Sequence, residues 1–185
     1  ELGKNLWPGQ TTVVVKSTVL PGTTKKVEEI ISQNKSEKAN FSLAFCPEFL
    51  REGKAIEDTF HPSRVIIGSE DKKAVNVLKK LHAFFGAPIL TMKIESAELA
   101  KYAANAYLAL RIVFANQIAD LAEKVGADVE EVIGGIGLDP RIGDGYWYPG
   151  LGYGGSCFPK DVAALASFSA KKGLKKSLFS FMDNY

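Results

Sequence analysis

The chain has 185 residues, of which 46% are hydrophobic and 24% charged, with a formal net charge of +2. This composition argues against disordered and fibrous classes and is typical of a globular protein that buries a core, as one domain or two small ones. Because the charges are interspersed and no apolar run approaches the ~18 residues of a membrane span, we expect no nucleic-acid partner and no membrane partner. The two cysteines fit a reducing compartment, so we expect a cytoplasmic location.

The first half of the chain alternates short apolar runs with helical patterns. Strands are predicted at 11–18, 41–46, 64–68 and 88–91, and helices at 23–34 and 71–85. Such alternation indicates βαβ units in an α/β layer with a parallel sheet. Because these folds bind ligands at the carboxyl ends of their strands, Ser17, Thr18 and the loop 47–53 are expected at the binding edge.

The second half of the chain is predicted to be helical. Residues 95–125 contain no Gly or Pro and are rich in Ala, Leu, Glu and Lys, which predicts one helix of roughly 45 Å. It is apolar around much of its circumference, so we expect a twofold partner to cover it. Shorter helices are predicted at 128–136 and 159–171, separated by a long loop.

A glycine-rich stretch joins that loop to the last predicted helix. Four glycines between 150 and 155 run into Ser156 and Cys157, and Pro159 opens the helical pattern. This places Cys157 at or just before a helix N-terminus, where the helix dipole and Lys160 favour a thiolate. The alternative is a glycine-rich turn capped by Ser156, with an inert cysteine.

Charged residues follow the second predicted strand. Glu48 and Glu52 lie in the loop 47–53, where a carboxylate can serve as a general base. They can equally be surface charges, with Arg51 paired to one of them.

The long helix and the glycine-rich stretch carry further polar candidates. Lys101 and Asn105 are spaced i, i+4 and share a helix face, where they could hold an oxyanion or a hydroxyl. A lysine directed to solvent beside a solvated asparagine is the alternative. Asp161 could position water near the thiol of Cys157 or stabilise the helix start. Together the candidates suit chemistry through a thioester.

The cysteine and histidine content argues against a disulfide-stabilised protein and against a zinc site. Two cysteines are too few for a disulfide framework, and with two scattered histidines they show no zinc-ligand spacing, so we expect no metal site. The sequence begins at Glu1 and soon reaches a strand of buried type. We therefore expect a piece of a longer protein.

Five segments resemble, in the same order, the UDP-glucose/GDP-mannose dehydrogenase family. They are Lys16-Ser-Thr-Val-Leu-Pro-Gly-Thr23, Pro47-Glu-Phe-Leu-Arg-Glu-Gly53, Pro62-Ser-Arg-Val-Ile-Ile-Gly68, residues 95–105, and residues 150–161. Arg141-Ile-Gly143 and residues 152–161 resemble the UDP-glucose branch. The resemblance implies the C-terminal part of a Rossmann-like NAD-binding domain over 1–93 and a central helical dimerisation domain over 94–185. Cys46 departs from the family, which usually has Asn there, and no G-x-G-x-x-G fingerprint occurs near the N-terminus.

The resemblance also implies a reaction and a set of site residues. The family oxidises the C6 alcohol of a nucleotide sugar to a carboxylate with NAD, in two hydride transfers separated by attack of a cysteine, here Cys157, on the aldehyde. The implied catalytic residues besides Cys157 are Glu48 as base, Lys101 for the oxyanion, Asn105 and Thr18 for the alcohol or a water, and Asp161 in support. The implied contacts to the UDP-sugar are Phe49, Leu50, Arg51, Tyr148, Pro149, Gly150, Leu151, Gly152, Tyr153 and Gly154, with Arg141 reaching the neighbouring subunit's site. The implied contacts to NAD are Ser17, Thr18, Val19, Glu52 and Lys160.

Two other functions remain open on the sequence. One is a dehydrogenase for a different nucleotide sugar, such as GDP-mannose or a UDP-N-acetylhexosamine. The other is a non-catalytic helical dimerisation module.

Overall fold

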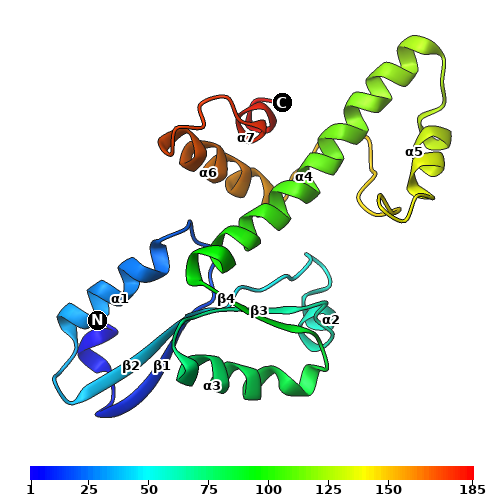
Figure 1. The fold of residues 1–185 in the computed structure, drawn as a ribbon. Coiled ribbons are helices and arrows are strands. Elements are labelled where there is room, and N and C mark those ends of the chain that lie inside the picture. Colours follow the sequence, from blue (N-terminus) through cyan, green and yellow to red (C-terminus); the bar gives the residue numbers. More distant parts are fainter. The chain divides into compact units, whose positions relative to one another are not determined.

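The computed structural model describes residues 1–185, and Figure 1 shows its helices and strands. The chain divides into two units, residues 1–101 and 102–185. The elements of the first unit are η1 (Gly3–Asn5), β1 (Gly9–Val15), α1 (Thr23–Asn34), β2 (Ala39–Phe45), α2 (Ala55–Phe60), β3 (Val65–Gly68), α3 (Lys72–His82), η2 (Ala83–Phe85) and β4 (Ile89–Met92). The long helix α4 (Ile94–Val125) begins in the first unit and continues into the second, which also holds α5 (Val129–Gly137), α6 (Phe158–Lys171) and α7 (Leu178–Asp183).

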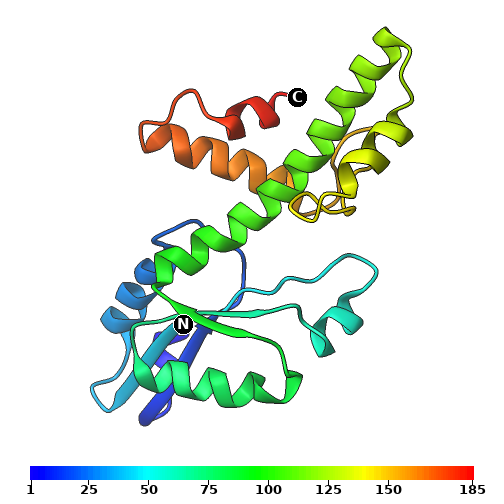
Figure 2. The same ribbon diagram turned by 45° about the vertical axis from the view of Figure 1, so that its right-hand side comes forward.

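The sheet of the first unit carries helices on both faces. Figures 1 and 2 show α3 on one side and α1 with the start of α4 on the other. Because successive strand residues point to opposite faces, Ala44 and Cys46 pack with α3, whereas Phe45 packs with the first turn of α4. A Cβ at Gly68 would lie 2.6 Å from the Cβ of Ala97. A larger residue there would therefore push α4 away from the sheet.

The strand order is β1-β2-β3-β4, and the sheet is mixed. β1 pairs with β2 and β3 with β4 in parallel, but β2 and β3 pair antiparallel through Phe45 and Gly68. The predicted α/β class, with a Rossmann-like sheet and a helical second half, is confirmed. The prediction of a wholly parallel sheet is wrong, because β2 and β3 pair antiparallel. The composition of an apolar run does not encode the direction of the neighbouring strand, so the sequence had no signal for this pair.

The second unit is helical. Its core joins Ala109 of α4, Val162 of α6 and Met182 of α7. Gly126 ends α4 with a left-handed φ of 73°, a conformation that glycine adopts readily. None of the helices is both long enough and apolar enough to cross a membrane.

Most predicted elements correspond to observed ones. The helix predicted at 23–34 coincides with α1, and the one predicted at 95–125 differs from α4 by one residue. The remaining predicted helices correspond to α3 with η2, to α5 and to α6, and the predicted strands correspond to β1–β4 with shifted ends. The helices α2 and α7 were not predicted, because six residues are too few to show a helical period.

Candidate active site

The carboxyl ends of β1 and β2 bring two predicted site segments to one edge of the first unit. Val15 pairs with Phe45, and the N–H of Cys46 donates to the carbonyl of Val15 at 2.9 Å. The chain after β1 then exposes Ser17 and leaves Thr18 half-buried. The parallel register therefore sets these two hydroxyl residues beside the segment that leads to Glu48.

Glu48 and Lys101 form an ion pair in the first unit. The Nζ atom of Lys101 lies 3.3 Å from Oε1 of Glu48, and the lysine side chain is only 5% exposed. The other carboxylate oxygen of Glu48 accepts a hydrogen bond from the N–H of Leu50 at 2.6 Å. A buried ammonium next to a carboxylate that stays 37% exposed is suited to stabilise negative charge that develops nearby.

Phe49 packs between two cations. The guanidinium carbon of Arg64 lies 3.8 Å from the centre of the Phe49 ring, and the Nζ of Lys101 lies 4.9 Å from it. Burial lowers the pKa of Arg64 from its usual value, although the side chain stays charged. The aromatic ring thereby holds the loop 47–53 against both cations.

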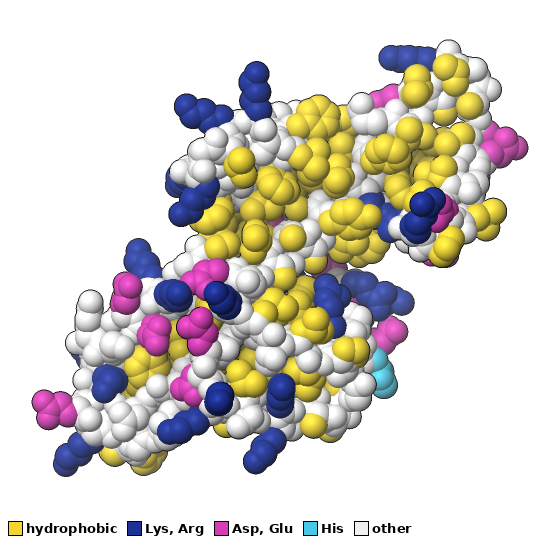
Figure 3. Space-filling model, in the orientation of Figure 1, with side chains coloured by type: hydrophobic (Ala, Val, Ile, Leu, Met, Phe, Trp, Pro, Cys, Tyr) yellow, Lys and Arg dark blue, Asp and Glu magenta, His cyan; other side chains and the backbone are white.

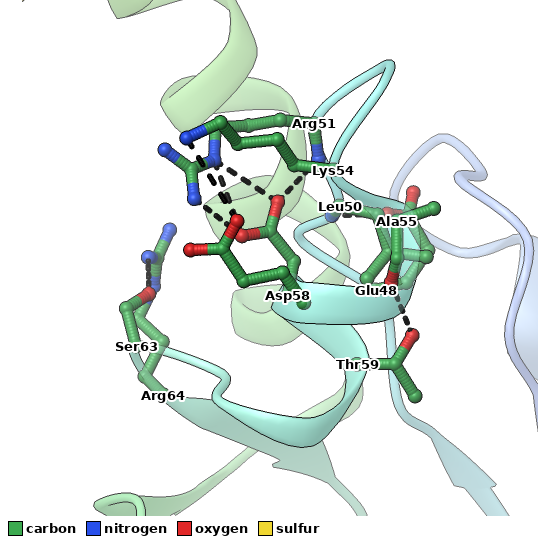
Figure 4. A network of polar contacts seen from close by, with 10 residues as sticks. Glu48, Leu50, Arg51, Lys54, Ala55, Asp58, Thr59, Ser63 and Arg64 are labelled. Carbon is green, nitrogen blue, oxygen red and sulfur yellow. Dashed lines mark hydrogen bonds and ion pairs between the residues drawn. The ribbon is translucent and has the colours of Figure 1, made fainter.

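The loop 47–53 is tied to α2 by a bidentate ion pair (Figure 4). The guanidinium of Arg51 donates to both oxygens of Asp58, from Nη2 at 2.5 Å and from Nε at 3.0 and 3.2 Å. The backbone N–H of Arg51 adds a hydrogen bond to the same carboxylate at 2.7 Å. These contacts hold the pKa of Asp58 well below its usual value, at about 2. They fix the path of the loop that begins at Glu48.

The Arg51–Asp58 pair makes stability depend on pH. The folded-state pKa of Asp58, about 2, lies below its usual 3.8, so this contribution is present above pH 4 and is lost as the pH falls towards 2. Urea unfolding of wild type and Asp58→Asn should therefore differ most near neutral pH and converge in acid. Asp120→Asn, at an exposed position of α4, is the control and should differ little from wild type at any pH. A gap between wild type and Asp58→Asn that stayed constant down to pH 2 would contradict the assignment.

Cys157 occupies the N-cap position of α6, as the sequence predicted. Its carbonyl accepts the first helical hydrogen bond, from the N–H of Asp161 at 3.1 Å, and Pro159 lies in the first turn. The thiol is half-buried, and the Oγ of Ser156 lies 3.6 Å from its Sγ. Cys157 thus lies at the start of α6, and its thiol makes no cap hydrogen bond to the first turn.

A buried polar network lies beside Cys157 in the second unit. Asp161 is 2% exposed; it accepts a hydrogen bond from the Nδ2 of Asn105 at 2.6 Å and one from the Nζ of Lys160 at 2.7 Å. Burial lowers the pKa of Lys160, but the hydrogen bond and the charge of Asp161 outweigh this effect, so its pKa is raised. Burial and, next, the charge of Asp161 raise the pKa of Tyr102. Asp161 therefore fixes both an amide and a cation around the helix start.

The two cysteines differ in environment, which predicts different reactivity. Cys46 is 0% exposed, and burial raises the pKa of its thiol although the Nζ of Lys16 lies 3.8 Å away. We expect iodoacetamide at neutral pH to label Cys157 about tenfold faster or more in the native full-length protein, because alkylation requires an accessible thiolate. Peptide mapping by mass spectrometry measures both rates. Faster labelling of Cys46 would refute the expectation.

The loop between α5 and α6 is held by contacts within the second unit. The N–H of Gly150 donates to the Oδ1 of Asn116 at 2.7 Å, and the hydroxyl of Tyr153 donates to the carbonyl of Met182 at 2.7 Å. Arg141 is exposed and pairs with Asp139, with Nη2 2.6 Å from Oδ2. The loop backbone near Gly150 is therefore anchored to α4, whereas the guanidinium of Arg141 stays at the surface.

Sequence reasoning missed several residues of these networks. Asp58, Arg64 and Asn116 were not predicted, although Arg64 and Asp58 lie close in sequence to the loop 47–53 that they contact. Asp58 is buried and Arg64 is half-buried near that loop, but burial is visible only in the structure. Asn116 carried no signal, because an amide on a long helix is more often solvated.

The comparisons with known proteins cover both halves of the chain. Residues 2–86 match the model of the UDP-glucose/GDP-mannose dehydrogenase family, NAD binding domain, and residues 95–185 match the model of that family's central domain. The chain belongs to the UDP-glucose/GDP-mannose dehydrogenase family. The resemblance found in the sequence is thereby confirmed.

Relatives in this family agree in sequence and in fold. The UDP-glucose 6-dehydrogenase YwqF of Bacillus subtilis is 50% identical over 86% of this chain and 36% of the relative, and the UDP-glucose 6-dehydrogenase of Rhizobium meliloti is 48% identical over 89% and 38%. The solved UDP-glucose dehydrogenase of Pyrobaculum islandicum matches with a TM-score of 0.91 at 44% identity, over 95% of this chain and 41% of that one. The GDP-mannose dehydrogenase of Pseudomonas aeruginosa matches with a TM-score of 0.66 at 36% identity, with the same coverage. The chain thus spans little more than a third of the length of these curated family members.

Proposed function

We propose that this chain is part of an NAD-dependent dehydrogenase that oxidises UDP-glucose to UDP-glucuronate. The observation that carries the proposal is the thiol of Cys157 at the start of α6, beside the buried network of Asn105, Asp161 and Lys160. Curated relatives that are 48% and 50% identical over the aligned residues are named UDP-glucose 6-dehydrogenases, which favours UDP-glucose over other nucleotide sugars.

The residues at the sheet edge are chemically suited to a dinucleotide. The hydroxyl residues Ser17 and Thr18 follow the carboxyl end of β1, the edge at which such sheets bind ligands. Val19, Glu52 and Lys160 complete the proposed NAD contacts. NAD, when bound, accepts a hydride in each of the two oxidations.

Each of the proposed catalytic side chains has a role in one of the remaining steps. Asn105 and Thr18 help to hold the C6 alcohol or a water. The alcohol loses a hydride and releases its hydroxyl proton to water, and thereby becomes an aldehyde. The sulfur of Cys157 adds to the aldehyde carbon and forms a thiohemiacetal, while Lys101 balances the negative charge on its oxygen. Loss of a second hydride gives a thioester. Glu48 then takes a proton from water, which attacks the thioester and releases the carboxylate and the thiol.

Lys101 and Asn105 each have a partner among the proposed catalytic residues. Both lie on α4, one turn apart, and each contacts one of the two groups of polar residues described above, Lys101 at Glu48 and Asn105 at Asp161. The proposed sugar-nucleotide contacts are Phe49, Leu50, Arg51 and residues 148–154, with Arg141 directed to a neighbouring subunit.

Substrate preference tests the proposed function. The full-length protein should reduce NAD with UDP-glucose and form UDP-glucuronate, and it should act more slowly on GDP-mannose and UDP-N-acetylmannosamine at equal concentrations. A preference for either of those sugars would assign a different substrate within the same family. No NADH with any nucleotide sugar would favour the non-catalytic helical module.

We also propose that α4 forms a twofold interface with a second copy. Tyr107, Phe114 and Leu121 are 57%, 45% and 55% exposed and recur at seven-residue intervals, so they share one helix face. Figure 3 shows hydrophobic side chains gathered over the helical unit. Exposed apolar areas of this kind are uncommon on monomers. Sedimentation should give a dimer, and a monomer at high micromolar concentration would refute the interface.

We also propose that the boundary between the two domains lies between residues 93 and 94. The two family models end at 86 and begin at 95, and α4 starts at Ile94. A chain of residues 94–185 should keep a helical circular dichroism spectrum and unfold cooperatively, and loss of helicity would argue for another boundary.

A further inference from the structure

A buried carboxylate at the start of α4 has no part in the chemistry proposed above. Glu98 is 0% exposed, and its oxygens accept hydrogen bonds from the backbone N–H groups of Gly22 at 2.7 Å and Thr24 at 2.8 Å. Hydrogen bonds from N–H groups to a carboxylate are among the stronger ones in proteins. The contact joins positions that are 76 and 74 residues apart in the sequence.

Glu98 supplies the cap that α1 lacks. The N-cap residue of α1 is Gly22, which has no side chain to accept a hydrogen bond from the first turn. Its φ of 95° is strained for residues with a Cβ, so a serine or an aspartate is disfavoured there. Instead, the carboxylate of Glu98, which belongs to α4, accepts hydrogen bonds from two N–H groups at the start of α1. Its negative charge also lies at the positive end of the α1 dipole.

The contact between Glu98 and the start of α1 lies next to two segments with proposed functional residues. The chain from β1 to Gly22 contains Ser17 and Thr18, so the cap fixes the far end of that loop. Lys101 follows Glu98 by three residues and therefore lies next to it on the same helix face. Val19 and Phe49 pack against the same part of α4, in the cluster that contains Ile94 and Ala97. The cap is thus the polar link between the loop after β1 and the helix that presents Lys101.

We propose that Glu98 is a positioning residue. It holds the start of α1, and with it the Ser17–Thr18 loop, in a fixed place relative to the first turns of α4 and to Lys101. The proposed function supplies what these residues are positioned for, while the contact itself is independent of that function.

The substitution Glu98→Gln tests the proposal, with Glu95→Gln as its matched control. A glutamine has one acceptor oxygen, and its amide group would face a second donor, so at least one buried N–H loses its partner. Glu95 lies three residues earlier on the same helix and pairs with Lys25 at 2.5 Å, but its side chain is 40% exposed. The control therefore removes a carboxylate from the same contact region without uncapping α1.

Amide hydrogen exchange measures the contact directly. In Glu98→Gln, protection at Gly22 and Thr24 should fall by about tenfold or more, whereas Glu95→Gln should leave it within about twofold of wild type. If Glu98→Gln does not fold, the wild-type protein still decides the matter. Gly22 and Thr24 amides that exchange in wild type as fast as exposed loop amides would overturn the proposal.

Kinetics of the full-length protein distinguish positioning from a purely structural role. We expect kcat for UDP-glucose oxidation to fall by about tenfold or more in Glu98→Gln, with KM for UDP-glucose within about threefold, because misplaced catalytic groups lose transition-state contacts. A kcat per folded molecule within about twofold of wild type would show a stabilising role only and overturn the proposal. A wild-type protein that oxidised no nucleotide sugar would refute the proposed function instead, and the exchange result would then decide the contact alone.

Discussion

Replacement of Cys157 by serine in the full-length protein should abolish the conversion of UDP-glucose to UDP-glucuronate. A serine hydroxyl is far less ionised than a thiol at the N-cap of α6, and an ester is a poorer acyl donor than a thioester. The first oxidation does not need the sulfur, so some NADH can still form. The measurement is NADH produced and acid formed from UDP-glucose, by absorbance and by chromatography of the nucleotide products.

The control for this experiment is the other cysteine. Cys46→Ala removes a thiol that is fully buried in the core cluster below the sheet, so it should lower stability but keep acid formation. Near-wild-type acid formation by Cys157→Ser would exclude the thioester route and the assignment of the glycine-rich loop as the catalytic centre.

Replacement of Lys101 by alanine should slow the reaction by about a hundredfold, because losing one donor to a developing oxyanion typically costs ~3 kcal/mol. The ammonium is nearly buried and has the carboxylate of Glu48 as its ion-pair partner. KM for UDP-glucose should change less than kcat. Steady-state kinetics with saturating NAD measure both constants.

Two companion variants separate charge from packing at this position. Lys101→Met keeps most of the aliphatic stem and should lose nearly as much activity as Lys101→Ala. Lys124→Ala, at an exposed position near the end of α4, should behave like wild type. Wild-type kcat in Lys101→Met would show that the stem, and not the ammonium, matters.

The sequence predicted best the features that local chemistry encodes. The pair Pro21-Gly22 marks the start of α1, and the glycines with Pro159 mark the start of α6, so Cys157 was correctly placed at a helix N-terminus. The absence of Gly and Pro over 95–125 likewise predicted α4. These signals act within a few residues and do not depend on the rest of the fold.

Long-range features could not be predicted in this way. The antiparallel pairing of β2 with β3 depends on the path of the chain through residues 47–64, which contain only the short helix α2 and show no periodic pattern in the sequence. The cap that Glu98 provides to α1 joins positions 74 and 76 residues apart, and a glutamate on a helix is usually solvated. The structure also pairs Arg51 with Asp58 on α2, a partner that the sequence did not predict. The proposed catalytic roles of the site residues remain predictions.

The central claim is that a sugar acyl group passes through the sulfur of Cys157. Glu48→Gln in the full-length protein should slow hydrolysis of that thioester, because an amide cannot take a proton from water. Rapid quenching of the variant with UDP-glucose and NAD, followed by peptide mass spectrometry, should find a UDP-glucuronyl adduct on the peptide that contains Cys157. An unmodified Cys157 during the slowed reaction, or an adduct on Cys46 instead, would contradict the account.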